Sequence, residues 1–459
     1  MAASSTDAAV AVTRLGLGAR PGEIAQVAAD PRGWALAQIR PQGAPQPTGT
    51  FQTTDQRMAA FLAYQAQNRQ GDRSDPEATR AARQAARRAI TDDTAQAFLA
   101  RARHGATTNQ GFAERWALFW ANALTVSAVK FDSGAFVDSY EREAIRPNVF
   151  GRFQDLVVAA EQHPAMLLYL DQARSTGPGS PAGARRKVGL NENLAREMLE
   201  LHTVGADAGY TQADVTELAR ALTGWSIPRP QDAQNQNAAF VFRANVHEPG
   251  SRTIMGKTYP ATGRAAGKDQ GEAILRDLAR HPATARRLSH RIAAHFVADA
   301  PPPSLVTRLE TAWTRSDGDL AQVARALVEA PETWAAPPSK IKTPYEFVVS
   351  THRALGVPPE RLAPLRQTLV AMGQPPFAPP SPEGWPDTAA DWAGPDALVK
   401  RLNWARSAAE TARTADIVAT ANDTLGDRLS ERTRLAVARA ESRTEALTLL
   451  LMSPEFQRR

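Results

Sequence analysis

Bulky apolar residues recur with the period of a helix in the stretch GFAERWALFWANALTVS, residues 111–127. Phe112, Trp116, Phe119, Trp120 and Leu124 fall on one face of such a helix, and a stripe of this kind is usually buried. The same period continues through most of the chain, and the later helical segments that it predicts are 270–299, 304–316, 319–330, 342–356, 360–372, 396–412 and 430–452. The sequence therefore predicts a mainly α fold in which residues 1–459 form one large helical domain.

The period changes from helical to alternating in AFVFRANVHEPGSRTIMGKTYP, which begins at residue 239. Phe240 and Phe242 alternate with other residues, Pro249–Gly250 is a turn signal, and the alternation resumes at Thr253 and Ile254. We expect one small β-hairpin near 239–259 as the main β element of the fold.

Three other segments lack a regular pattern. Residues 65–88 are polar and poor in apolar anchors, which indicates an exposed helix or insertion. Residues 173–189 are rich in glycine and proline, have a basic end, and are predicted to form a flexible surface loop. The proline-rich stretch GQPPFAPPSPEGWPD is expected to cross the surface irregularly and to pack through Phe377 and Trp385.

Composition excludes several classes of function. The chain has no cysteine, which excludes disulfides, thiol catalysis and cysteine-ligated metal centres. The net charge is +6, but the basic residues are spread along the chain, and the densest run, Thr79–Arg88, contains no aromatic residue. We therefore expect no nucleic acid as a partner. No apolar run approaches the roughly 20 residues that a membrane span needs, and no motif predicts a metal or another cofactor.

Polar residues are unusually dense in NENLAREMLELHTVG, residues 191–205. On a helix, one arc of about 140° collects the charged and amide side chains of Glu192, Asn193, Arg196, Glu197 and Glu200. The opposite arc is apolar, and His202 lies within it, where a core histidine is more common than a metal ligand. Arg196 is four residues from both Glu192 and Glu200 and can bridge them. The arc is either a solvated ion-pair face or the lining of a cleft.

The cleft hypothesis supplies candidate site residues. The candidate catalytic residues are the carboxylates and the arginine of the arc, with two carboxylates from the following helix: Glu192, Glu197, Glu200, Arg196, Asp214 and Glu217. Flanking polar and aromatic groups are candidates for binding: Asn191, Asn193, Arg220, Trp225, His247 and Asp171. The loop 173–189 leads directly into the polar helix and is a candidate lid.

Several motifs resemble the bacterial family DUF1800, a domain of unknown function. They are HPAMLLYLD, the block from Asn191 to Trp225, HEPGSRTIMGKTYP, HPATARRLSHRIAAHFVADAPP and the ending LLLMSPEFQRR. The resemblance covers nearly the whole chain and implies a single, mostly helical domain. It also implies export for many members, although this chain shows no signal peptide, so its compartment is not predicted. Many members resemble FWHNHF where this chain reads FWANAL, with Ala121 and Ala123 in place of histidines.

Two classes of function are compatible with these observations. The first is a hydrolase or lyase that acts on an extracytoplasmic polymer such as a polysaccharide, with the polar arc as its site. The second is a non-catalytic helical partner or assembly factor. The resemblance implies a partner of this kind, because members are commonly encoded beside a sulfatase-like and phosphatase-like protein.

Overall fold

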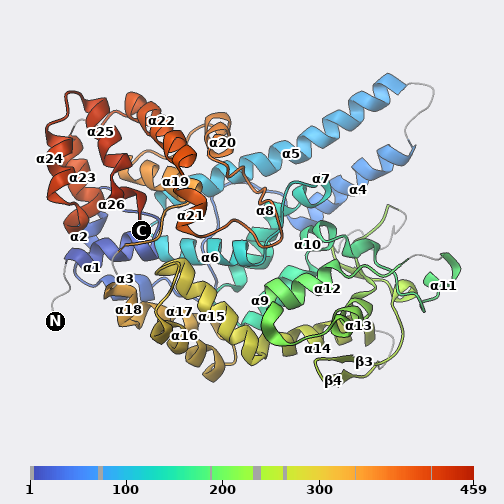
Figure 1. Ribbon diagram of the computed structural model, residues 1–459. Coiled ribbons are helices and arrows are strands. Elements are labelled where there is room, and N and C mark those ends of the chain that lie inside the picture. The colour runs from blue at the N-terminus through green and yellow to red at the C-terminus, as the bar shows by residue number, and fades with distance from the viewer. Residues whose placement is uncertain are drawn as a thin grey trace.

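Helices make up most of the computed structural model, which describes residues 5–70, 76–186, 189–230, 239–261, 266–335, 338–414 and 416–459 (Figure 1). The α-helices are α1 (Ser5–Val10), α2 (Glu23–Val27), α3 (Pro31–Leu36), α4 (Thr54–Gln70), α5 (Pro76–Thr107), α6 (Gly111–Ala123), α7 (Phe131–Gly134), α8 (Val137–Ser139), α9 (Phe153–Gln162), α10 (Pro164–Tyr169), α11 (Gly183–Arg186), α12 (Asn193–Glu197), α13 (Gln212–Leu222), α14 (Ala266–Arg280), α15 (Pro282–Phe296), α16 (Pro303–Arg315), α17 (Leu320–Glu329), α18 (Pro331–Ala335), α19 (Pro344–Leu355), α20 (Leu362–Ala371), α21 (Ala389–Trp392), α22 (Pro395–Thr411), α23 (Ile417–Leu425), α24 (Glu431–Ala438), α25 (Arg443–Met452) and α26 (Pro454–Gln457). The strands β1 (Trp225–Ser226), β2 (Val241–Phe242), β3 (Arg252–Ile254) and β4 (Lys257–Tyr259) form two antiparallel pairs. The predicted mainly α single domain is confirmed.

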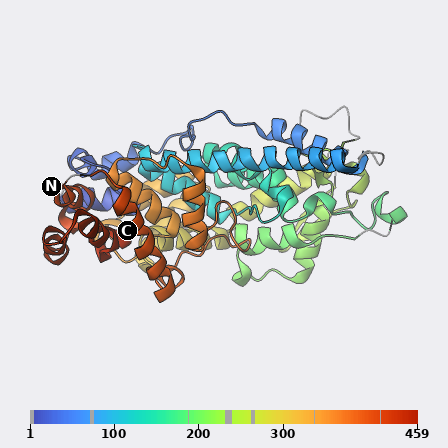
Figure 2. The same cartoon turned by 90° about the horizontal axis from the view of Figure 1, so that it is seen from above.

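The aromatic stripe of α6 lies in the larger of two hydrophobic clusters. Its five predicted residues are each at most 5% exposed, and Trp116 donates from Nε1 to the Val149 carbonyl at 2.7 Å. The second cluster joins α5 and α19 to the C-terminal helices, and Phe377 packs against both clusters. Figure 2 shows an elongated molecule with the C-terminal helices at one end and the region of α12 and α13 toward the other.

Two helices begin with the same three residues, His-Pro-Ala. His163 precedes α10 and His281 precedes α15, and in each case Nδ1 accepts a hydrogen bond from the backbone N–H of the alanine at 3.2 Å. Proline is favoured at the next position because its missing N–H and fixed φ suit the first turn. For this reason the stretch predicted to be helical at 270–299 divides into α14 and α15 at His281–Pro282.

The β-hairpin lies within the predicted range, but the predicted turn was wrong. Strands β3 and β4 pair with Arg252 opposite Tyr259, and the chain reverses at Met255–Gly256, where φ is +47° and +78°. Two successive positive φ angles match the twist of a two-residue hairpin turn. The upstream strand β2 pairs instead with β1, which brings Phe240 edge-on against the buried Trp225 ring at 5.8 Å.

The polar segment 65–88 forms the outer ends of α4 and α5, which project together from the body of the protein (Figure 1). Residues 71–75, between the two helices, lie outside the described residues. The loop predicted at 173–189 contains the short helix α11, and its residues 187 and 188 also lie outside the described part. None of the described helices combines the length and hydropathy of a membrane span.

A fully buried arginine joins three segments of the first cluster. Arg146 donates to both oxygens of Glu114 at 2.7 and 2.8 Å, to Glu141 at 2.8 and 3.0 Å, and to the Pro45 carbonyl at 2.7 Å. Burial alone would lower the pKa of Arg146, but its two carboxylate partners outweigh burial and raise it. Burial likewise opposes ionisation of Glu114, yet Arg146 holds the pKa of that carboxyl well below its usual range. Arg146 and Glu114 are therefore ionised at any physiological pH.

We expect Arg146→Met to lower the free energy of unfolding by about 3–5 kcal/mol, since it leaves two buried carboxylates without their main partner. Arg434→Met is the matched control, because Arg434 pairs with Glu431 on the surface, where a pair contributes about 1 kcal/mol or less. Urea denaturation of both variants checks this. Equal losses in the two variants would show that the Arg146 network is not a stabilising element.

The buried His163 makes stability depend on pH. Burial, followed by Arg142 and Arg57, lowers the pKa of His163 to about 3, and its Nδ1 must stay unprotonated to cap α10. The unfolded chain binds the proton near pH 6.5, so stability falls as the pH drops from about 6.5 toward 3. His163→Asn keeps a capping oxygen and removes the titration. Between pH 7 and 5, the variant should lose about 2 kcal/mol less stability than the wild type in urea titrations, and an unchanged slope would contradict this role.

Candidate functional site

The larger of the two described pockets lies between α5, α6, α15, α19 and the loop at 372–388, which joins α20 to α21. Its volume is about 120 Å³. A buried cavity of about 150 Å³ accommodates benzene, so this pocket accommodates one ring-sized group. The lining includes four aromatic side chains (Phe98, Tyr345, Phe377 and Trp385) and four charged or polar ones (Arg115, His295, Glu346 and Asp387).

The 372–388 loop is fixed to α6 by one amide side chain. Asn122 donates from Nδ2 to the Trp385 carbonyl at 3.0 Å and accepts from the Trp385 N–H at 2.7 Å. The preceding Gly384 has φ +90°, and a Cβ there would lie 2.6 Å from the carbonyl oxygen and from Oδ1 of Asn122. A side chain at 384 would therefore push the loop off α6, so the sequence Gly-Trp holds Trp385 and Asp387 at the pocket.

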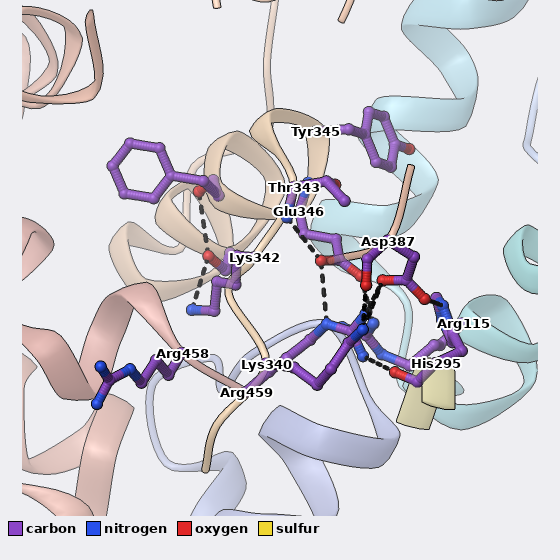
Figure 3. Close-up of polar contacts among 12 residues, drawn as sticks. Arg115, His295, Lys340, Lys342, Thr343, Tyr345, Glu346, Asp387, Arg458 and Arg459 are labelled. Carbon is purple, nitrogen blue, oxygen red and sulfur yellow. Dashed lines mark hydrogen bonds and ion pairs between the residues drawn. The ribbon is translucent and has the colours of Figure 1, made fainter. Parts of the chain in front are cut away.

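A chain of ion pairs leads from the core to the pocket (Figure 3). Arg115, on α6, pairs with Glu346, which also accepts from Arg459 Nε at 3.1 Å. Arg459 reaches Asp387 with its other end at 3.1 Å, and Lys340 lies 3.2 Å from the same carboxylate. Burial would raise the pKa of Glu346, but Arg115 and Arg459 outweigh it and lower the pKa to about 2.

His295 ends this chain of contacts and keeps one nitrogen free. Its Nδ1 lies 2.6 Å from Asp387 Oδ2, and because an ionised carboxylate only accepts, Nδ1 carries the proton. Burial would raise the pKa of Asp387, but the contacts from His295, Arg459 and Lys340 hold it well below its ordinary value. Burial lowers the pKa of His295 to about 4, although Asp387 opposes this shift. Nε2 is buried and has no hydrogen-bond partner among the described residues, so at neutral pH it presents a lone pair.

The polar arc predicted at 191–205 forms the expected bridge, at the surface. Arg196 lies 3.5 Å from Glu192 and 3.6 Å from Glu200, with the arginine side chain 39% and each carboxylate 32% exposed. Pairs this exposed contribute about 1 kcal/mol or less. Glu192 also accepts from Gln212 and Thr216, and Glu200 accepts from Tyr210. These contacts attach α12, and the π-helical turn Met198–His202 that continues it, to α13 and the preceding loop.

Most of the other predicted residues have a local partner. Asp214 completes the capping box of α13 with Thr211 and accepts from the Met255 N–H. Glu217 pairs with Arg220 and Arg252, and Asp171 pairs with Lys130. The remaining binding candidates are buried, as Trp225 is, or bonded to nearby backbone, as Asn191 is to Leu170 and His247 to Thr223, while Asn193 begins α12. None of the twelve predicted residues lines the two described pockets, and their catalytic and binding roles stay predictions.

Glu197 differs from the rest of the arc. It is partly buried, and no residue of the described chain hydrogen-bonds or ion-pairs with its carboxylate. Burial raises its pKa, and Glu383 of the 372–388 loop is near enough to contribute to that rise. Glu197 is therefore the one carboxylate of the arc without a direct partner in the described chain, and it lies within electrostatic range of Glu383. His202, on the apolar side, is buried beside Glu161, as expected for a core histidine.

The sequence model of a protein family described as "Protein of unknown function (DUF1800)" matches residues 10–458. The chain is a DUF1800 protein. No curated protein and no solved structure matches it. The described residues of this DUF1800 protein contain no group of three or more side chains suited to hold a metal ion.

The pocket residues of the DUF1800 protein were not among the sequence candidates. One signal was available in α6, where Glu114 and Arg115 stand inside an aromatic stripe and must therefore be paired. A second signal was the resemblance described in the sequence analysis, which implies histidines where this chain has Ala121 and Ala123. Ala121 lines the pocket, whereas Ala123 is buried in the core at 3% exposure. His295 and Asp387 come from segments with no local signal of their own.

We expect His295 to be neutral at pH 7, protonated at Nδ1, and to titrate near pH 4. Two-dimensional ¹⁵N NMR of the imidazole nitrogens separates the two tautomers and the imidazolium. In Asp387→Asn the Nδ1 proton loses its carboxylate acceptor, and the fraction of the other tautomer should rise. An imidazolium signal at pH 7 in the wild type would contradict the assignment.

Proposed function

We propose that this DUF1800 protein is an acid–base enzyme, a hydrolase or lyase, whose site is the His295 pocket. The observation that carries the proposal is the free Nε2 of His295 on an imidazole oriented by Asp387. A neutral imidazole held in one tautomer by a carboxylate is suited to accept a proton. As a hydrolase, Nε2 takes a proton from a water molecule whose oxygen attacks the substrate. As a lyase, Nε2 takes a proton from a substrate carbon while the leaving group departs from its neighbour.

The pocket wall supports a substrate that contains rings. Trp385 and Tyr345 line the pocket together with charged side chains, and the pocket volume of about 120 Å³ accommodates one ring-sized group. Aromatic rings pack against the apolar faces of sugars while polar groups fix their hydroxyls. An extracytoplasmic polysaccharide, the substrate class expected from the sequence, therefore remains our proposal for the substrate, with the His295 pocket as the reacting centre.

The test is a screen of the purified protein against bacterial polysaccharides and against phosphate and sulfate esters. Release of reducing ends reports hydrolysis, and ultraviolet absorbance of a new carbon–carbon double bond reports elimination. His295→Gln should remove activity at least 100-fold, and His290→Gln is the matched control, because His290 is exposed on the same helix. The acid limb of kcat/KM should lie near pH 4, where burial places the pKa of His295. Turnover that survives in His295→Gln would overturn the proposal.

One observation favours the second class, a non-catalytic partner of a co-encoded sulfatase-like protein. Leu398, Val399 and Leu402 form an apolar patch on α22 with 41%, 55% and 45% of their surface exposed. Contiguous exposed apolar residues often mark protein interfaces. If this class is correct, Leu402→Asp should abolish co-purification with the sulfatase-like protein, and His295→Gln should leave it unchanged.

A further inference from the structure

Three basic residues repeat at four-residue intervals along α15: Arg287, Arg291 and His295. Residues at this spacing lie on one helix face, and four residues span about 6 Å of helix. All three are partly buried, whereas Arg286 and His290 on the other side of the helix are exposed. The face that presents His295 to the pocket thus continues as two arginines.

Arg291 has no direct partner in the described part of the chain. No hydrogen bond and no ion pair within 4.0 Å involves its guanidinium, and Asp387 and Glu383 attract it only from a greater distance. Two fully buried arginines differ in this respect, since Arg146 is engaged by two carboxylates and Arg353 by Glu23 and three carbonyls. The guanidinium nitrogens of Arg291 are not among the fully buried nitrogens that lack a partner, so they reach solvent and their five donors can bind an acceptor that enters from it.

Arg287 lies beside Arg291 and has no carboxylate partner either. It donates from Nη1 to the Leu201 carbonyl at 2.5 Å, which leaves the rest of its guanidinium uncommitted. Gly205 makes room for its stem, because a Cβ there would lie 2.6 Å from Arg287 Cδ. Burial, and then repulsion from Arg291, lowers the pKa of Arg287 to about 10. Two partly desolvated cations held side by side are a binding site for an anion.

We propose that Arg287 and Arg291, two turns and one turn of α15 from His295, bind an oxyanion of the substrate. The chemistry that they recognise is a carboxylate, sulfate or phosphate group, whose oxygens match the forked guanidinium donors. This inference rests on the proposed function and narrows its substrate class to anionic polymers. It also accounts for the spacing Arg-x-x-x-Arg-x-x-x-His on α15. The two arginines position the polymer substrate, and His295 exchanges a proton with it.

Affinity electrophoresis against three anionic polymers tests the proposal, with polygalacturonate, dextran sulfate and polyphosphate as the carboxylate, sulfate and phosphate probes and neutral dextran as the blank. Arg291→Gln should weaken binding of the preferred polymer at least tenfold. Arg286→Gln, which removes the same charge from the exposed side of α15, should change it less than twofold. Equal effects of the two variants, or no binding of any anionic polymer by the wild type, would overturn the proposal.

Thermal unfolding separates a binding role from a structural one. Because Arg291 has no partner to lose, Arg291→Gln should unfold at the same temperature as the wild type or above it. A lowered unfolding temperature would show that Arg291 stabilises the fold and would count against the site. His295→Gln should bind the anionic polymer as the wild type does. If His295→Gln binds the polymer and also keeps turnover, the proposed function is wrong and the anion site is retained. If Arg291→Gln binds the polymer as tightly as the wild type, the anion site alone is wrong.

Discussion

Two adjacent charges in the middle of an aromatic helix fix how the rest of the protein packs. Glu114 and Arg115 occupy neighbouring positions on α6 and are both buried, yet they point to different partners, Arg146 on one side and Glu346 on the other. Breaking either pair would leave a charge in the core, at a cost of several kcal/mol. The helix therefore cannot rotate or shift by a residue without losing both pairs. Its register determines which residues face the first cluster and which face the pocket.

The same constraint organises the candidate site. Arg115 holds Glu346, Glu346 and Asp387 share Arg459, and Asp387 orients His295. Each of these contacts joins charged side chains and restricts their conformations. The imidazole of His295 is therefore positioned by core residues as well as by the loop, as acid–base chemistry requires. The two networks differ at their ends. The donors of Arg146 all find acceptors in the core, whereas the contacts that lead to His295 leave one nitrogen without a partner.

The sequence predicted the helical fold because periodic burial is a local signal, and it placed the stripe of α6 and the Arg196 bridge correctly. It placed the hairpin but not its turn, since the positive φ of Met255 is not encoded by a typical turn residue.

The site could not be predicted in the same way. Arg115, His295, Glu346 and Asp387 lie far apart in sequence, and each is ordinary in its own segment. The dense polar stretch 191–205 attracted attention for a local reason: most of its side chains satisfy one another and the next helix. A dense run of polar side chains in this sequence indicates groups that pair with one another. The candidate site is marked instead by a polar group that lacks a hydrogen-bond partner.

The segment Ala121–Ala123 of α6 bears on the same pocket. Ala121 lines the pocket and Ala123 packs in the core, while Asn122 between them holds the loop that carries Trp385 and Asp387. Position 121 therefore contributes only a methyl group to the lining of the pocket. A histidine at 121 would fill space and add a second titrating ring beside His295. The alanine leaves His295 as the one imidazole among the lining residues described, so acid–base chemistry in this pocket depends on that single ring and on the charges that orient it.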